Sequence, residues 1–230
     1  MAELGELGGD NWFSLGDRDL ATHLYRSQRL SQGATKSLVT SEIAARRGLG
    51  LAIVPASDDP VATILDTEIG ELTFQSYFVQ HHHSVTTQSI RYEGAATARP
   101  SDAALTALQT AERIVIAPSN PVLSIEPILA IPGFRDILVA RRDHVTAISP
   151  FVGGSALKGP ADRLMNELGF GASNVGIAKY YADYVSTLVI DEVDRADARE
   201  VEATGVAVRV TTTVMADPGH ADQLVRTVLA

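Results

Sequence analysis

The chain has 230 residues, 45% of them hydrophobic and 20% charged, as in an ordinary globular protein that needs no disulfide support. Its net charge is −9 and it has no cysteine, which excludes disulfides, thiolate metal sites and a cysteine nucleophile. The acidic balance disfavours nucleic-acid binding, and no apolar stretch is long enough to cross a membrane. We expect a cytoplasmic protein, because residues 1–10 lack the features of a signal peptide.

Two helical patterns open the chain. Residues 2–9 resemble the end of a helix whose beginning is missing, closed by two glycines. A second pattern starts near Asp17, with Leu20 and Leu24 on one face. Asp17 or Asp19 is the expected cap at the positive end of this helix.

Five short apolar runs rich in Val and Ile predict strands that are buried on both faces, because most of them lack in/out alternation. The runs occupy residues 51–57, 113–119, 144–150, 187–193 and 206–212. Helical patterns separate most of them, at residues 102–112, 133–143, 159–169, 172–185, 195–205 and 217–230. This alternation predicts an α/β, Rossmann-like fold with a mostly parallel sheet and helices on both faces.

One segment breaks the alternation. Residues 62–78 predict a β-hairpin that turns near Glu68–Glu71, and residues 86–94 predict a further extended piece. We therefore expect a small, partly antiparallel subdomain inserted between about residues 60 and 100. Including this subdomain, we expect residues 1–230 to form a single Rossmann-like domain that is incomplete at its N-terminus.

The loop after the third run carries the features of a phosphate site. Ligands of open α/β sheets bind beyond the carboxyl ends of the strands. Here Gly153 and Gly154 permit close backbone approach, Ser155 adds a hydroxyl and Lys158 adds a cation, beside a helix expected to start near Pro160. A flexible connection capped by glycines explains this loop equally well.

The loop after the second run, "PSNPVLS", is stiff and polar. Pro118 and Pro121 restrict the backbone, while Ser119, Asn120 and Ser124 offer hydrogen-bond donors and acceptors to a ligand. The alternative is an Asx-type turn with Ser124 as the N-cap of the next helix. We favour the cap for Ser124 and a ligand for the other two.

Three further polar stretches have structural explanations that we favour over functional ones. The histidines at residues 81–83 point in different directions, which suits a solvated loop better than a metal site. The acidic stretch at residues 191–197 suits a helix start with capping acids better than a cation site. Asp58 and Asp59 suit a turn. On the second helix, the carboxylate that does not cap could face a ligand together with Thr22 and His23.

In order, "LGDRDLATH", "DDPV", "APSNPVLSIEPILAIPG", "SPFVGGSALKGPADRLM" and "YYADYVSTLVIDEVD" resemble the 2-phospho-L-lactate transferase family, CofD/FbiA type. The resemblance runs from about Asn11 to the C-terminus. It implies an enzyme of coenzyme F420 biosynthesis that transfers a phospholactyl or phosphoenolpyruvyl group from a guanosine-diphosphate-linked donor. The acceptor is the terminal hydroxyl of the deazaflavin Fo, and GMP is released. It also implies Mg²⁺ and a homodimer.

Carried over onto this chain, the resemblance assigns two groups of substrate-binding residues and no metal ligand. The "PSNP" and "VGG" loops would hold the nucleotide and diphosphate, and the "GDRDLATH" stretch would hold the deazaflavin. The assigned residues are Ser14, Asp17, Arg18, Asp19, Thr22, His23, Ser119, Asn120, Ser124, Ser149, Gly153, Gly154, Ser155 and Lys158. No general base is identifiable.

Two departures from the family pattern affect these expectations. The family begins with a strand, a glycine-rich loop and metal-binding acidic residues, and this chain starts after them. We therefore expect the Mg²⁺ ligands to lie outside the 230 residues, and weak or no turnover by them. Ser14 stands where some members have a basic residue that contacts the deazaflavin. The rival interpretation is a nucleotide-sugar-binding regulatory protein of the same superfamily, which would bind GDP without binding Fo.

Overall fold

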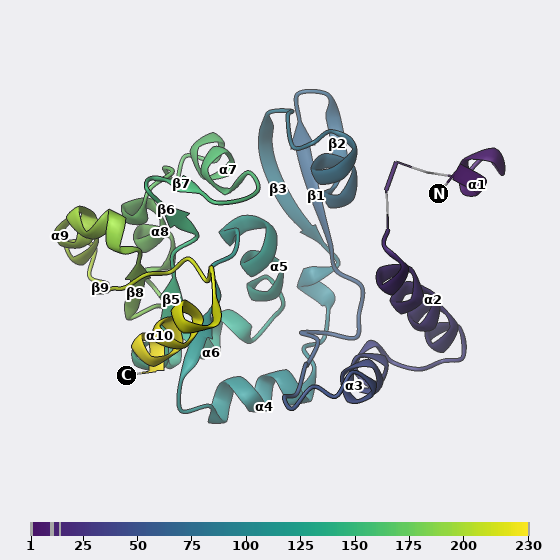
Figure 1. The fold of residues 1–230 in the computed structure, drawn as a ribbon, viewed down its shortest axis with the longest axis horizontal. Helices are drawn as coiled ribbons and strands as arrows, with labels where there is room; N and C mark the ends of the chain where they lie inside the picture. Colours follow the sequence, from purple (N-terminus) through teal and green to yellow (C-terminus); the bar gives the residue numbers. More distant parts are fainter. Residues whose placement is uncertain (1, 10–11, 14, 230) are drawn as a thin grey trace.

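The fold centres on a four-stranded parallel sheet in a computed structural model that describes residues 2–9, 12–13 and 15–229 (Figure 1). Its strands run in the order β4-β5-β8-β9, and every neighbouring pair is parallel. Their bounds are β4 Ile114–Ile116, β5 Val145–Ile148, β8 Thr187–Ile190 and β9 Ala207–Val210. Four of the five predicted strands are confirmed, and so is the α/β fold class.

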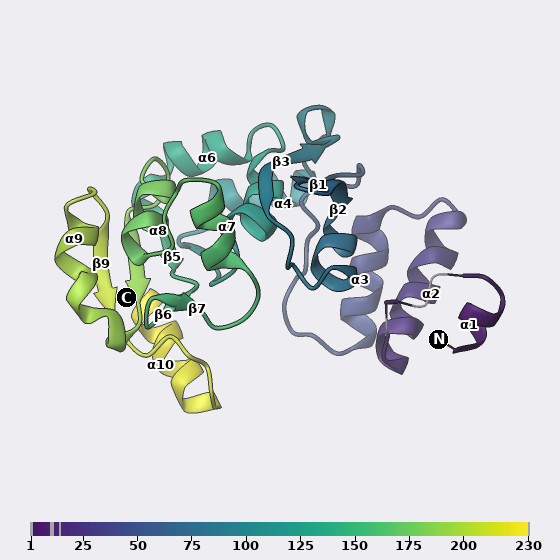
Figure 2. The same ribbon diagram turned by 90° about the horizontal axis from the view of Figure 1, so that it is seen from above.

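Helices cover both faces of this sheet. From residue 100 on they are α4 Asp102–Thr110, α5 Glu126–Leu129, α6 Phe134–Ala140, α7 Ala161–Glu167, α8 Asn174–Tyr181, α9 Ala198–Glu202 and α10 Pro218–Leu229. Alternate strand residues point to opposite faces. Ala147 and Leu188 belong to the main core, whereas Ile148 and Val189 pack with Leu224 of α10. Figure 2 shows α6 and α10 on opposite sides of β5.

The predicted strand at residues 51–57 is wrong. The segment pairs with no strand, and its one bridge joins Ser57 to Pro100. Leu51 and Ile53 are 65% and 45% exposed, so the segment lacks the two-sided burial that its composition suggested. Pro55 also lacks the N–H that a central strand requires.

A second, antiparallel sheet confirms the predicted hairpin and the extended piece that follows it. Its order is β2-β1-β3, with bounds β1 Ala62–Thr67, β2 Gly70–Thr73 and β3 Thr87–Glu93. Leu65 of β1 is fully buried in the main core. The Tyr92 hydroxyl donates to the Val122 carbonyl oxygen at 2.6 Å. Core packing and this hydrogen bond hold the second sheet against the segment that follows β4.

The N-terminal helices are α1 Ala2–Glu6, α2 Asp17–Ser31 and α3 Lys36–Arg46. The predicted cap of α2 is wrong: Gly16 occupies the N-cap and no side chain caps it, while Asp17 and Asp19 lie in the first turn. The helix dipole still favours their charge there. The helix α3 was not predicted. Thr35 caps it by accepting from the Leu38 N–H at 3.2 Å.

Short elements complete the chain. They are the π-helices η1 Ser76–Gln80 and η3 Pro121–Ile125, the 3₁₀ helices η2 Ala95–Thr97, η4 Arg142–His144 and η5 Glu192–Asp197, and the hairpin strands β6 Phe151–Val152 and β7 Ser155–Ala156. Across the described ranges, no helix has the length and apolar content needed to span a bilayer.

Candidate functional site

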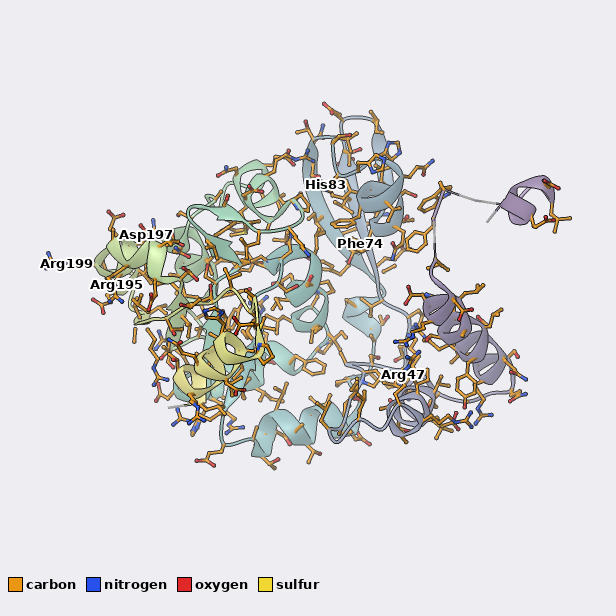
Figure 3. All side chains as sticks on the ribbon, in the orientation of Figure 1. Arg47, Phe74, His83, Arg195, Asp197 and Arg199 are labelled. Carbon is orange, nitrogen blue, oxygen red and sulfur yellow. The ribbon has the colours of Figure 1, made fainter. Side chains whose placement is uncertain are left out.

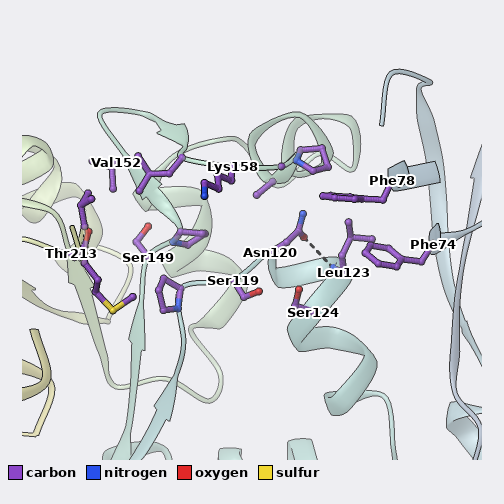
Figure 4. A pocket seen from close by; sticks show the side chains of 18 residues that line it. Phe74, Phe78, Ser119, Asn120, Leu123, Ser124, Ser149, Val152, Lys158 and Thr213 are labelled. Atoms are coloured by element: carbon purple, nitrogen blue, oxygen red, sulfur yellow. Dashed lines mark hydrogen bonds between the residues drawn. The ribbon is translucent and has the colours of Figure 1, made fainter. Parts of the chain in front are cut away.

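A pocket of about 450 Å³ lies beyond the carboxyl ends of β4, β5 and β9 (Figure 4). This is where ligands bind in open α/β sheets, and the volume suits a nucleotide-sized molecule. Its polar lining consists of Ser119, Asn120, Ser124, Ser149, Lys158 and Thr213. Five of these six residues were assigned to substrate binding from the sequence. The pocket therefore joins the loops after the second and third predicted strands at one site.

The side-chain amide of Asn120 has a hydrogen-bonded oxygen and, among the described residues, a nitrogen without a partner. Its Oδ1 accepts from the backbone N–H groups of Val122 and Leu123, at 3.0 and 3.1 Å, and so caps η3. This fixes the orientation of the amide. Its Nδ2 is buried and has no hydrogen-bond partner among the described residues. Figure 4 shows this nitrogen pointing away from η3, on the side where Lys158 and Phe78 lie. A buried donor without a partner is costly, so an acceptor on a ligand would satisfy it.

The predicted cap at Ser124 is wrong. Asn120 occupies the N-cap of η3, and Ser124 lies inside this π-helix, where its N–H donates to the Asn120 carbonyl oxygen at 2.9 Å. Ser124 nevertheless lines the pocket, as does Ser119 at the end of β4. The loop is thus an Asx-type cap and a pocket wall at the same time. These two interpretations of the "PSNP" stretch are compatible.

Ser149 lines the pocket, but its hydroxyl serves the scaffold. The side chain is buried, its Oγ donates to Asn174 Oδ1 at 2.6 Å, and it accepts from the Phe151 N–H at 3.2 Å. Asn174 Nδ2 in turn donates to Asp197 Oδ2 at 3.0 Å. Ser149 therefore fixes the end of β5 and has no hydroxyl proton to offer a ligand.

The two glycines after β6 form the turn of a β-hairpin. Val152 pairs with Ser155, and Gly153 and Gly154 have φ values of +64° and +78°, as a tight hairpin turn requires. The Gly153 N–H donates to Asp194 Oδ2 at 3.0 Å. The structure places Gly153, Gly154 and Ser155 outside the residues that line the pocket. Their substrate role stays a prediction, although the turn alone explains the glycines.

Lys158 brings a cation to the pocket. Its side chain is exposed, lines the pocket and forms no ion pair within the described part of the chain. Ammonium groups are common partners of phosphate oxygens in proteins. Together with Asn120, Lys158 gives the pocket two donors and a positive charge, which suit an anionic ligand.

The acidic stretch at residues 191–197 starts a helix that an aspartate caps, as the sequence predicted. Asp191 is buried, caps η5 by accepting from the Val193 N–H at 3.1 Å, and accepts from the Thr213 N–H and hydroxyl at 2.7 and 3.0 Å. Burial opposes ionisation, but these donors outweigh it and hold the pKa of Asp191 below its ordinary value. Asp191 thereby positions Thr213, which lines the pocket.

The residues assigned on α2 lie away from this pocket (Figure 1). The side chains of Asp17, Arg18, Asp19 and His23 are exposed. The Thr22 hydroxyl donates to the Arg18 carbonyl oxygen at 2.8 Å and accepts from Arg47 Nη2 at 3.0 Å; Figure 3 shows Arg47 beside this helix. The structure does not bring these residues to the strand ends, and their binding role stays a prediction.

Ser14 lies outside the described residues, so its assignment stays a prediction.

Sequence reasoning missed part of the pocket wall. Phe74 follows β2, Phe78 lies in the π-helix η1, and Thr213 and Met215 come from the segment after β9. The small polar run at residues 211–213 gave a signal for Thr213, because it follows a strand. No sequence signal placed the two aromatic residues in the pocket, because only the packing of the second sheet brings them to the strand ends.

Two turn predictions have defined partners. Asp58 accepts from the Ser37 N–H at 2.7 Å, and Asp59 accepts from the Arg99 N–H at 2.8 Å.

His82 and His83 lie in a turn after η1. Over the described ranges, no group of three or more His, Asp or Glu side chains is arranged to hold a metal ion.

Comparison with known proteins identifies the family. The sequence profile described as 2-phospho-L-lactate transferase CofD matches residues 3–228. The chain belongs to the CofD family. A phosphoenolpyruvate transferase from Kitasatospora aureofaciens is 39% identical, over all of this chain and 73% of that protein. A 2-phospho-L-lactate transferase from Methanococcoides burtonii is 38% identical, over 93% of this chain and 69% of that protein. The chain is thus a member of a family of transferases.

A solved structure shares the fold of this CofD-family chain. A member of the UPF0052 family from Bacillus halodurans superposes with a TM-score of 0.67 and 16% sequence identity. The match covers 92% of this chain and 72% of the other. At this identity the likeness concerns the architecture alone.

Proposed function

We propose that this chain is a transferase that moves a phospholactyl or phosphoenolpyruvyl group from a guanosine-diphosphate-linked donor to the terminal hydroxyl of Fo, in coenzyme F420 biosynthesis. Family membership and the names of the curated relatives support the reaction type. The observation that carries the proposal in this chain is the free Asn120 Nδ2 in the strand-end pocket, beside the cation of Lys158. Within the described part of the chain neither donor has an acceptor, and a diphosphate supplies acceptors.

In the proposed reaction, the Fo hydroxyl oxygen attacks the phosphorus that carries the lactyl or enolpyruvyl group. A new phosphorus–oxygen bond forms to Fo, the bond to the GMP phosphate breaks in line with it, GMP leaves as the anion, and the proton of the Fo hydroxyl passes to water. Phosphoryl transfer of this kind depends on positioning and charge neutralisation more than on covalent catalysis. Asn120 and Lys158 would hold the diphosphate oxygens. We assign no general base.

Binding measurements test the proposal. We expect saturable binding of both GDP and Fo, measured by isothermal titration calorimetry and by Fo fluorescence. Binding of GDP without Fo would instead support the nucleotide-sugar-binding alternative. Binding of neither would overturn both.

Turnover is a separate measurement. The assay follows conversion of Fo with donor and Mg²⁺ by fluorescence-detected chromatography. Formation of the Fo adduct together with GMP would establish the reaction. The Mg²⁺ requirement, the homodimer and the cytoplasmic location stay predictions. Omission of Mg²⁺, sedimentation and fractionation of cells test them in turn.

Asn120→Asp isolates the free donor. Aspartate keeps an oxygen that caps η3, so the fold is retained, but it removes the Nδ2 donor and adds a negative charge. We predict at least tenfold weaker GDP binding with a melting temperature within about 2 °C of the parent.

Asn166→Asp is the matched control. Asn166 Oδ1 accepts from the Ala172 N–H at 2.8 Å, and the residue lies outside the pocket. The Asn166→Asp variant should bind GDP like the parent chain. Equal GDP affinity of Asn120→Asp and Asn166→Asp would show that Asn120 does not contact the diphosphate.

A further inference from the structure

Two phenylalanines form an aromatic wall on the side of the pocket opposite the strand ends. Phe74 and Phe78 both line the pocket, and their ring centroids lie 5.5 Å apart at an interplanar angle of 29°. Figure 4 shows both rings across the pocket from Ser149 and Thr213. Phe78 is 36% exposed, which is high for a ring that already stacks on a neighbour. The aromatic wall thus presents apolar ring surface to the pocket.

The aromatic wall is held on an unusual backbone. Phe78 belongs to the π-helix η1, and π-helical turns are rare and frequent at functional sites. His82 and His83, just after it, have φ values of +48° and +45°, in the left-handed region that side chains disfavour. The His83 ring lies 5.4 Å from the Phe78 ring, so this turn packs against the wall.

Buried contacts anchor η1 to the rest of the molecule. Tyr77, next to Phe78, is fully buried, and its hydroxyl accepts from Arg163 Nη2 of α7 at 2.9 Å. Gly159 lies close to the Phe78 ring, since a Cβ there would be 3.5 Å from Cε2 of Phe78. The φ of Gly159 is +74°, so glycine suits this position. Phe78 is therefore fixed in place before any ligand binds.

We propose that the aromatic wall stacks on the planar heteroaromatic ring of a ligand whose anionic part lies at Asn120 and Lys158. The pocket offers donors and a cation on one side and a flat apolar surface on the other. A molecule with a phosphate and a flat ring system matches both halves. This inference rests on the proposed function, in which two ligands carry such a ring: the nucleobase of the donor and the deazaflavin of the acceptor.

Stacking on an aromatic side chain strengthens binding substantially, and its loss weakens binding by about tenfold or more. Phe78→Leu keeps an apolar side chain but removes the ring, so it separates stacking from simple burial. We expect Phe78→Leu to bind GDP at least tenfold more weakly and Phe78→Trp to restore binding. Loss of Fo affinity alone would place the acceptor ring on the wall and contradict the pairing of the wall with the anion site, because Fo has no phosphate.

Phe170→Leu is the matched control. Phe170 is 43% exposed and its ring lies 4.7 Å from that of Tyr180, but it does not line this pocket. The Phe170→Leu variant should bind GDP and Fo like the parent chain. The melting temperature of each variant shows whether the fold is retained. Parent-like binding of both GDP and Fo by Phe78→Leu would overturn the proposal.

A failure of the proposed function is recognised separately, because the parent chain would then bind neither GDP nor Fo. In that event riboflavin 5′-phosphate serves as the probe, since it combines a phosphate with a planar ring system. Binding by the parent that is lost in Phe78→Leu and kept in Phe170→Leu would uphold the aromatic wall. No binding, or equal binding by all variants, would overturn it.

Discussion

Asp191 is a buried carboxylate that holds two loops with its two oxygens. One oxygen caps η5 through the Val193 N–H, and the other accepts from the Thr213 N–H and hydroxyl. We predict that Asp191→Asn lowers the free energy of unfolding by about 1–3 kcal/mol, because an amide NH₂ would face donors that then lack an acceptor. Urea denaturation at pH 7 measures this. Glu192→Gln makes the same chemical change at an exposed neighbour and should stay within about 0.5 kcal/mol.

Asp191 also makes the stability of the fold depend on pH. Its pKa in the folded state lies below the ordinary value, so its contribution to stability is present above that ordinary value. The contribution is lost as the pH falls toward the folded-state pKa. Asp191→Asn should remove this part of the acid sensitivity. A parallel loss of stability with pH in parent and variant would contradict the assignment.

The residues of the pocket show which local patterns can be predicted from sequence. Ser119, Asn120 and Lys158 follow strands whose apolar composition is unmistakable, and the strand-end rule then places them at one edge of the sheet. The rule does not say which hydroxyls are already used, so it could not exclude Ser149 as a donor. Phe78 escaped prediction because tertiary packing alone brings it to the pocket.

At the scale of elements, composition predicted strands well where burial is two-sided. The strands β5 and β8 are buried along nearly their whole length. The run at residues 51–57 is also rich in apolar residues, but residues 51–54 lie exposed on the surface, where composition alone misleads. The helix α3 was missed although Thr35 gave a capping signal, because its apolar positions form no clear stripe.

One carboxylate of α3 holds two side chains of α2. Glu42 accepts from Arg29 at 2.8 and 3.0 Å and from the Tyr25 hydroxyl at 2.6 Å. The Arg29 hydrogen bonds, helped by Tyr25, lower the pKa of Glu42 from 4.5 to about 2. We predict a carboxyl titration midpoint near pH 2, measured by carbon-13 NMR. Arg29→Met should move the midpoint back toward 4.5.

The sign of the resulting stability change follows from this shift. Because the folded-state pKa is depressed, the pair stabilises the helix contact fully above about pH 4.5, and the contribution disappears as the pH falls toward 2. The surface position makes the effect modest. A Glu42 midpoint that is the same in the parent and in Arg29→Met would contradict the pairing.

The whole molecule combines a continuous core with a lightly attached N-terminal part. The antiparallel sheet, through Leu65, and the adjoining η1, through Tyr77, share the main core with the parallel sheet. By contrast, α2 has no buried residue, and its apolar Leu20 and Leu24 are 45% and 63% exposed. Figures 1 and 2 show α2 and α3 at one end of the molecule, beyond the antiparallel sheet. The two parts should therefore open at different free energies.

Hydrogen exchange tests this division. We predict that amides of α2 exchange at least roughly a hundredfold faster than those of β5 and β8, after correction for intrinsic rates, because few buried contacts oppose local opening. Glu42→Gln should accelerate exchange in α2 further and leave β5 and β8 unchanged. Protection of α2 equal to that of the sheet would show that the molecule opens as a single unit. Faster exchange of amides throughout the chain in Glu42→Gln would also show opening as a single unit, because the loss of one contact in α2 would then lower the stability of the whole molecule.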